Sequence, residues 1–266
     1  MKPVRLIYAA IYLLALYAPI AIVVLFSFND SIYPAFPLRD FTLKWYETAL
    51  ANNELWRALK NSLLVATTTA VVSTAIGLLA ALAVSRYQFH LRKTITLLLY
   101  APLALPTVVA GVALLSLFLL AGVRLSLATV AIGHVLVCTP FAFGVLSSRL
   151  EGLHPDFEHA SMDLGEGPFF TFWRVTLPLA LPGILSSLML TFTISFDEFI
   201  LSFFLSSNSP TLPVFMWSQM RFPDRLPMVL ALATGVLALS VILIVLSLVI
   251  QGRNKNPIPG VQQRHG

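Results

Sequence analysis

The stretch NSLLVATTTAVVSTAIGLLAALAVS, residues 61–85, holds 25 residues without a charge and decides the fold class. A bilayer core of about 30 Å is crossed by about 20 apolar residues in a helix. Along the whole chain, six uncharged segments flanked by charged residues are long enough to cross a bilayer. They are residues 6–29, 61–85, 94–123, 125–148, 175–196 and 226–252. A membrane-spanning strand needs only about 10 residues, so these lengths predict an all-α, polytopic membrane protein with six transmembrane helices.

The composition of the whole chain agrees with this class. Of its 266 residues, 58% are hydrophobic and 11% are charged, against roughly 25% charged in a soluble domain. So few charges cannot cover a soluble surface, but they can cover the two ends of a bundle that faces membrane lipid. The net charge of +5 fits basic residues kept on the cytoplasmic side, so no nucleic-acid partner is expected.

The basic residues also predict an orientation. An even number of helices places both termini on one side of the membrane. Lys2 and Arg5 precede the first stretch, the tail at 253–266 has three more basic residues, and the loop 86–93 has three and no acid. Both termini are therefore predicted to be cytoplasmic. The first stretch exceeds the apolar core of a signal peptide, about 7 to 15 residues, so it is interpreted as a retained helix.

Catalytic and metal-binding motifs are not found along the sequence. There is no GxxxxGK(S/T) loop and no Gly-Lys dipeptide, so the chain is expected to be no enzyme, and ATP and Mg would belong to a separate partner. Glu151 and His154 form one Glu-x-x-His, but a di-metal site needs two, so no metal site is expected. In the fourth stretch, His134 is interpreted as a hydrogen-bonded packing residue and the single cysteine, Cys138, as a buried small side chain.

The most informative loop is PDFEHASMDLGEGPFFTFWRVTLP, residues 155–178. Its pattern predicts a helix, a break and a second helix. Asp156 and Glu158 complement the positive end of a helix dipole, and Gly165 is placed to end that helix in a left-handed cap. Pro168 can then begin a short helix that leads into the fifth stretch.

One face of the first loop helix is apolar or small, made by Phe157, Ala160, Ser161 and Leu164. Nothing in the sequence is obliged to cover this face in water, so it is interpreted as a surface for another protein's groove. The alternative, an amphipathic helix lying on lipid, predicts more Lys and Arg than this acidic segment contains.

The loop also resembles a known motif. His159-Ala160-Ser161, three residues, Gly165, nine residues and Val175-x-Leu177-Pro178 are similar to the EAA loop (EAA, x3, G, x9, I-x-L-P). That loop belongs to the membrane subunits of binding-protein-dependent ABC importers. The family's glutamate falls on His159 here, and the nearest acid is Glu158, so either side chain could make the family's contact with the ATPase.

The resemblance implies an architecture and partners. It implies the type I ABC importer permease fold over residues 61–252, with a coupling loop at 149–177, after an N-terminal helix and external loop at 1–60 and before a tail at 253–266. Implied partners are a second permease subunit, two ATPase subunits and a periplasmic or extracellular solute-binding protein, in a bacterial inner membrane. The family can pair identical or different permeases, and a different second permease is expected here. The implied ATPase-coupling residues are Glu158, His159, Ala160, Ser161, Asp163, Gly165, Leu177 and Pro178.

Within this family, three stretches resemble the polyamine (spermidine/putrescine) branch. They are LPTVVAGVALL at 105–115, ISFDEFILSFF at 194–204 and TLPVFMWSQM at 211–220. Permeases for phosphonates, opines and ferric iron have related sequence segments, so these solutes remain alternative substrates.

Two adjacent carboxylates, Asp197 and Glu198, are the only acids at membrane depth. Charged groups there normally face a cavity or a partner. Neighbouring helical residues diverge by about 100°, so the two cannot face one lumen. Helical spacing favours Glu198 as pore-lining, because it continues a polar stripe of Ser187, Thr191, Ser195, Glu198 and Ser202. Asp197 is then predicted to make an inter-subunit or loop contact.

Aromatic residues lie close to the acids in the sequence, namely Phe196, Phe199, Phe203 and Trp217. Carboxylates among aromatic rings suit an organic cation through charge and cation-π attraction. A salt bridge to Arg221 or Arg225 without a substrate role stays open. The predicted pathway residues are Glu198, Asp197, Ser195 and Trp217.

Two further patterns concern helix packing. Small residues recur every four positions in the second stretch and predict close helix contact; they are Thr69, Ser73, Gly77, Ala81 and Ser85. Pro102 and Pro106 are predicted to kink or break the start of the third stretch.

Together these features predict a permease subunit that moves polyamines by alternating access. The rival from another class is an ion-coupled secondary transporter. Such a transporter predicts inverted repeats and a charged site near the midplane, and neither is seen in the sequence.

Overall fold

The computed structural model describes residues 2–253, with side chains described at 5–238 and at 241. Within those residues the chain is mostly helical, and the one β-bridge joins Asn29 to Phe41. The chain divides into two compact units, a larger one at 54–217 and a smaller one at 1–53 and 218–266.

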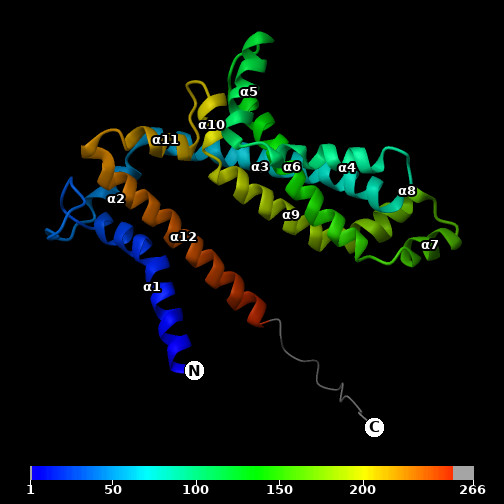
Figure 1. The fold of residues 1–266 in the computed structure, drawn as a ribbon, viewed down its shortest axis with the longest axis horizontal. Coiled ribbons are helices and arrows are strands. Elements are labelled where there is room, and N and C mark those ends of the chain that lie inside the picture. The colour runs from blue at the N-terminus through cyan, green and yellow to red at the C-terminus, as the bar shows by residue number, and fades with distance from the viewer. Residues whose placement is uncertain (1, 254–266) are drawn as a thin grey trace. The chain divides into compact units, whose positions relative to one another are not determined.

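The larger unit contains most of the elements (Figure 1). In chain order these are α3 (Asn53–Arg86), α4 (Arg92–Tyr100), η1 (Ala101–Ala104), α5 (Thr107–Leu120), α6 (Leu127–Glu151), α7 (Asp156–Asp163), α8 (Pro168–Thr171), the π-helical η2 (Phe172–Thr176), α9 (Leu177–Asp197), α10 (Ile200–Leu205) and α11 (Leu212–Gln219). The smaller unit holds α1 (Lys2–Ser27), α2 (Lys44–Leu50), η3 (Pro223–Arg225) and α12 (Leu226–Arg253).

Four helices in the described part of the chain are long and apolar enough to cross a membrane, or five spans if one bent pair is counted. The four straight ones are Arg5–Ser27, Asn53–Arg86, Leu127–Glu151 and Pro168–Asp197. They coincide with four of the six predicted stretches. The sixth stretch, 226–252, lies within the 28-residue α12, whose later side chains lie outside the described residues.

The third predicted stretch, 94–123, is bent near its start. Arg92–Ala104 and Thr107–Leu120 meet at 102°. The bend lies at Leu105, whose ψ of 131° is extended, and at Pro106, which has no N–H to continue a helix. The predicted proline break is therefore confirmed, and it turns the chain sharply.

The helix that contains the second predicted span begins before the uncharged stretch. α3 begins at Asn53, so its first turns lie in the segment assigned to an external loop at 30–60, which also contains α2. Glu54, Arg57 and Lys60 are helical residues of α3. Charged residues end an apolar segment, but they do not end a helix, because Glu, Arg and Lys are good helix formers.

The core of the larger unit forms where α3, α6 and α9 pack together. Figure 1 shows α6 and α9 running side by side. At Gly77 of α3, an added Cβ would lie 2.8 Å from the Ala142 Cβ and 2.9 Å from the Phe143 N. Thr69, Ser73 and Ala81 of the same stripe are buried, which confirms the prediction of close packing by small residues.

A second close approach joins α6 to α9. A Cβ on Gly183 would lie 2.6 Å from the Arg149 Cγ, so only glycine leaves room for the arginine stem. The guanidinium of Arg149 donates to the Leu179 carbonyl oxygen from Nε at 3.2 Å and from Nη2 at 2.7 Å. The basic end of α6 is thereby fixed against the first turn of α9.

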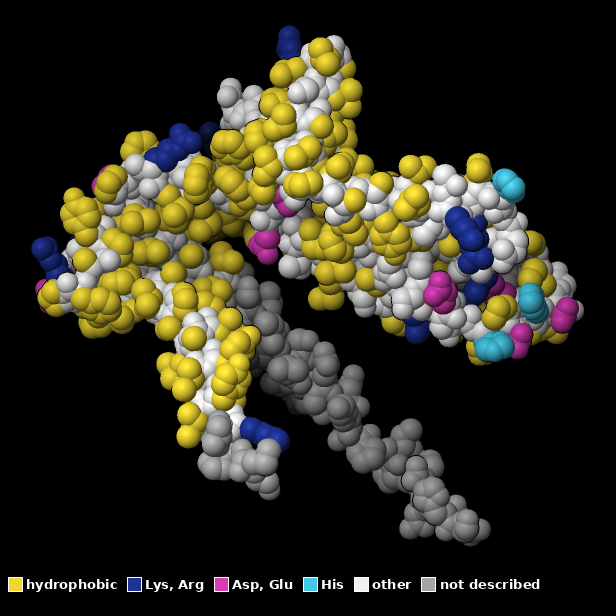
Figure 2. Space-filling view, viewed as in Figure 1, with side chains coloured by type: hydrophobic (Ala, Val, Ile, Leu, Met, Phe, Trp, Pro, Cys, Tyr) yellow, Lys and Arg dark blue, Asp and Glu magenta, His cyan; other side chains and the backbone are white. Residues whose placement is uncertain are grey.

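Hydrophobic side chains cover much of the visible surface of the larger unit. Figure 2 shows them over α5 in particular, while charged and histidine side chains gather at the end that carries α7 and α8. Because lipid-facing surface is apolar and its ends are charged, this distribution fits a membrane protein.

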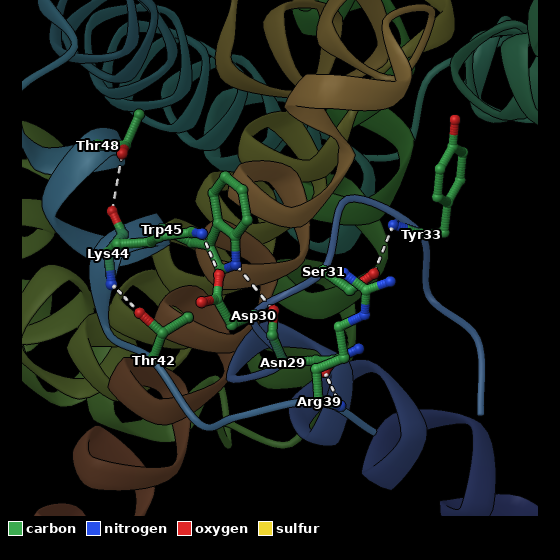
Figure 3. A network of polar contacts seen from close by, with 9 residues as sticks. All are labelled: Asn29, Asp30, Ser31, Tyr33, Arg39, Thr42, Lys44, Trp45 and Thr48. Atoms are coloured by element: carbon green, nitrogen blue, oxygen red, sulfur yellow. Dashed lines mark hydrogen bonds and ion pairs between the residues drawn. The ribbon is translucent and has the colours of Figure 1, made fainter. Parts of the chain in front are cut away.

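In the smaller unit, polar contacts order the segment between α1 and α2 (Figure 3). The buried Asn29 accepts at its Oδ1 from the Arg39 backbone N–H at 2.8 Å, and its backbone carbonyl accepts from Trp45 Nε1 at 2.9 Å. Lys44 pairs with Asp30. This part of the predicted external loop is therefore a folded structure.

Candidate functional site

The loop helix α7 ends as the sequence predicts. Gly165 has φ +93°, in the left-handed region, and an added Cβ would meet no atom within 4 Å. The Gly165 N–H donates to the Met162 carbonyl at 2.9 Å, and the Glu166 N–H donates to the Ser161 carbonyl at 3.2 Å. This pair of bonds is a Schellman cap. The requirement for glycine is therefore one of backbone angle, which confirms the predicted left-handed cap.

The residues of the predicted docking face of α7 do not all point away from the protein. Phe157 is exposed, and Leu164 is 87% exposed, so the chain leaves both uncovered. Ser161 is instead turned toward α8, where its Oγ lies 3.1 Å from the Thr171 Oγ1. His159, Ala160 and Asp163, from the predicted coupling set, are all exposed.

Glu158 faces into the protein, unlike its neighbour His159. Its carboxylate pairs with Arg86 at the end of α3, with 2.9 Å between Arg86 Nε and Glu158 Oε2. Thr176 Oγ1 donates to Glu158 Oε1 at 2.9 Å. The acid nearest the motif position is thus engaged within the chain.

The chain enters α9 through a wide turn that the sequence analysis missed. Over Phe172–Thr176 it is π-helical, and the Leu177 N–H donates to the Phe172 carbonyl, five residues back. The next residue, Pro178, has no N–H for the Arg174 carbonyl, and the loss of that bond favours a local π turn. The Leu-Pro end of the motif was the available signal. Leu177 and Pro178 form the first turn of α9.

The acid pair lies at a break between α9 and α10. Asp197 is the last residue of α9 and is exposed, while Glu198 has an extended ψ of 110°. Glu198 Oε1 accepts from the backbone N–H groups of Ile200 at 2.9 Å and Leu201 at 3.1 Å. It therefore caps the first turn of α10. The predicted continuous stripe is wrong beyond Ser195, because the helix stops before Glu198.

His134 joins the two sides of this break. Its Nδ1 lies 2.8 Å from Ser195 Oγ on α9, and its Nε2 lies 3.1 Å from Ser202 Oγ on α10. All three residues are buried, as are Ser187 and Thr191. The polar stripe therefore faces α6 at Ser195 and Thr74 of α3 at Ser187, where the two hydroxyls lie 3.0 Å apart, and not an open surface. The interpretation of His134 as a hydrogen-bonded packing residue is confirmed.

Aromatic rings cluster directly after the acids. The Phe199 centroid lies 5.6 Å from that of Phe203 and 5.5 Å from that of Trp217. Phe203 is 43% exposed and Trp217 is 48% exposed. The break thus places two carboxylates and partly exposed π faces in one region, a combination that attracts organic cations.

Comparisons with known proteins agree with these features. Residues 58–256 match a family described as "Binding-protein-dependent transport system inner membrane component". The spermidine/putrescine transport system permease protein PotC of Escherichia coli is 34% identical over 233 residues, covering 87% of this chain and 88% of that protein. The putrescine transport system permease protein PotI of the same organism is 32% identical over 244 residues, covering 89% and 86%.

A solved structure shows the same fold. A chain of a bacterial ABC transporter involved in the import of alginate superposes with a TM-score of 0.70, covering 94% of this chain and 95% of that one. The two sequences are 16% identical, so this likeness concerns the fold alone.

Proposed function

Because this chain belongs to the family of inner-membrane components of binding-protein-dependent transport systems, we propose that it is the permease subunit of an ATP-driven polyamine importer. The observation that supports a polyamine as the substrate is the sequence similarity to polyamine permeases, which extends over most of both chains. The acid and aromatic residues at the α9–α10 break support it independently, because a polyamine is an organic cation.

In this proposal the α9–α10 break faces the substrate pathway. Asp197 is exposed, and Trp217 and Phe203 offer partly exposed rings nearby in the chain. The two capping amides use one oxygen of Glu198, Oε1, and its other oxygen would meet a passing ammonium group. Ser195 acts indirectly, by holding the end of α9 to His134.

The proposed coupling surface is the exposed side of α7. Phe157, His159 and Leu164 would enter a cleft of a separate ATP-hydrolysing subunit, with His159 at the motif position that carries glutamate in the family. Their exposure supports this, because apolar side chains in water at a helix surface favour a partner's groove.

The full assembly has six transmembrane helices per permease and both termini in the cytoplasm. It contains a second permease subunit, two ATPase subunits and an external binding protein, and it works by alternating access between the two sides of the membrane. ATP and Mg bind in the ATPase subunits.

The test is reconstitution of the complex with its binding protein in liposomes. Spermidine uptake should require ATP inside the vesicle and should continue when ion gradients are collapsed. The purified permease alone should hydrolyse no ATP. Uptake driven by an ion gradient without ATP would contradict the proposal in favour of a secondary transporter. ATP-driven uptake of a phosphonate, an opine or ferric iron instead of spermidine would overturn only the substrate.

A further inference from the structure

One largely buried cluster of polar side chains ties the loop helix to two long helices, α3 and α9. Arg86, in the last turn of α3, contacts Glu158 of α7 through Nε, at 2.9 Å from Oε2 and 3.2 Å from Oε1. Its Nη2 donates to the Leu153 carbonyl at 3.2 Å. Thr176, at the start of α9, donates to Glu158 Oε1 at 2.9 Å. Glu158 is the shared acceptor at the centre.

The burial of this cluster separates it from other ion pairs in the loop. The Arg86 and Glu158 side chains are 15% and 17% exposed, and Thr176 is buried. The pair between Arg174 and Glu166, in the same loop, is 66% and 30% exposed. An exposed pair is screened and holds its partners weakly, while a largely buried pair with further hydrogen bonds resists separation.

The contacts at the two ends of α7 and α8 suggest how movement of α7 would reach the long helices. The Schellman cap at Gly165 and the bond between Ser161 and Thr171 hold α7 and α8 together. Thr176 ends the π-helical turn, and π turns inside α-helices are frequent at functional sites. A displacement of α7 would therefore pull on α3 through Arg86 and on α9 through Thr176.

We infer that Glu158 is a positioning residue that transmits movement of α7 to α3 and α9, and that it does not contact the ATPase. This inference rests on the proposed function, because it assumes that α7 docks on an ATPase. The Glu158 carboxylate is shared by the Arg86 guanidinium and the Thr176 hydroxyl. Removal of any of these three groups should therefore weaken the connection of α7 to α3 and α9.

The test measures spermidine transported per ATP hydrolysed in the reconstituted complex. Glu158→Gln and Arg86→Lys should keep the ATPase bound while transport per ATP falls about fivefold or more. Arg86→Lys keeps the charge, but lysine lacks the planar guanidinium that contacts Glu158 and the Leu153 carbonyl at the same time. Thr176→Val, which keeps the shape, should give a smaller fall, and Arg174→Gln, the exposed-pair control, should give none.

A charge exchange makes the experiment decisive. The double variant Arg86→Glu with Glu158→Arg should recover only part of the lost coupling, because the ion pair is restored with reversed sign while the bond to the Leu153 carbonyl stays lost. Loss of ATPase binding in Glu158→Gln without recovery in the exchange variant would show a direct contact and overturn the inference. Normal coupling in Arg86→Lys and Glu158→Gln would also overturn it. A wild-type complex without ATP-driven uptake would instead refute the proposed function.

Discussion

The α7–α8 loop and the α9–α10 break both interrupt a helix beside side chains to which we propose a function, but they do so by different means. In the loop, the interruption is encoded locally, by Gly165 at φ +93° and by Pro168. Between Ser195 and Ile200 there is no glycine or proline. That break is held by contacts, with Glu198 capping α10 and His134 joining Ser195 to Ser202. Substitutions should therefore act on the local backbone in the loop and on distant packing at the break.

The largest effect is expected at the locally encoded interruption. Gly165→Val places a β-branched residue at φ +93°, at a cost of about 1 kcal/mol or more, and should misdirect α7. ATPase association and uptake should fall together, by more than tenfold, while membrane insertion is unchanged. Co-purification of the ATPase and uptake assays measure both.

The matched control for this substitution is Gly167→Ala. Gly167 has φ −75°, and an added Cβ would meet nothing within 4 Å. Activity close to wild type is expected. Equal damage from both variants would remove the argument that the backbone angle of Gly165 matters.

The next effect concerns the charge at the break. Glu198→Gln retains a carbonyl oxygen that can cap Ile200 and Leu201 but removes the charge, which is worth about 1 to 3 kcal/mol in a partly dehydrated lumen. Spermidine uptake per assembled complex should weaken about tenfold, and a monoamine should be affected less. Asp197→Asn should instead reduce the amount of assembled complex.

The control for the acid pair is Glu47→Gln, an exposed acid on α2. It should leave uptake per complex unchanged. Wild-type spermidine uptake by Glu198→Gln would remove this residue from the proposed pathway and weaken the case for a cationic substrate.

A stability effect should show how the break is held. His134→Ala leaves the buried hydroxyls of Ser195 and Ser202 without their partner, at about 1 to 3 kcal/mol for each. Thermal unfolding of the chain in detergent should show a free energy of unfolding that is lower by about 2 to 6 kcal/mol. The exposed His90→Ala should change stability by less than about 0.5 kcal/mol.

A triple variant sharpens this test. Adding Ser195→Ala and Ser202→Ala to His134→Ala removes the unsatisfied hydroxyls, so part of the stability should return. A further loss in the triple variant would mean that cavity formation, and not hydrogen bonding, dominates at this position.

The smallest effect is expected within α7. Ser161→Ala removes the 3.1 Å contact with Thr171 and should cost about 1 kcal/mol. Alanine is also the family's residue at this motif position, so uptake should fall no more than twofold. A tenfold loss would indicate that this contact, and not the Schellman cap at Gly165, chiefly holds α7 to α8.

Much of the fold follows from the sequence because its causes are local. The lengths of uncharged segments predict four helices that the structure confirms, and proline chemistry predicts the break before α5. The loop helix and its left-handed cap follow from residues a few positions apart, since a Schellman cap joins residues within one turn.

Other features depend on residues far apart in the chain, and only the tertiary structure decides them. Helical spacing assigned Glu198 to a continuous stripe, but a bond across 61 positions, from His134 to Ser195, helps to define where α9 ends. The motif left Glu158 and His159 equivalent, and a pair across 72 positions, with Arg86, turns Glu158 inward. Composition and spacing determine which segments are helical, because that depends on neighbouring residues. Which carboxylate meets which donor depends on how α3, α6 and α9 pack, and periodicity along one helix carries no information about its partners.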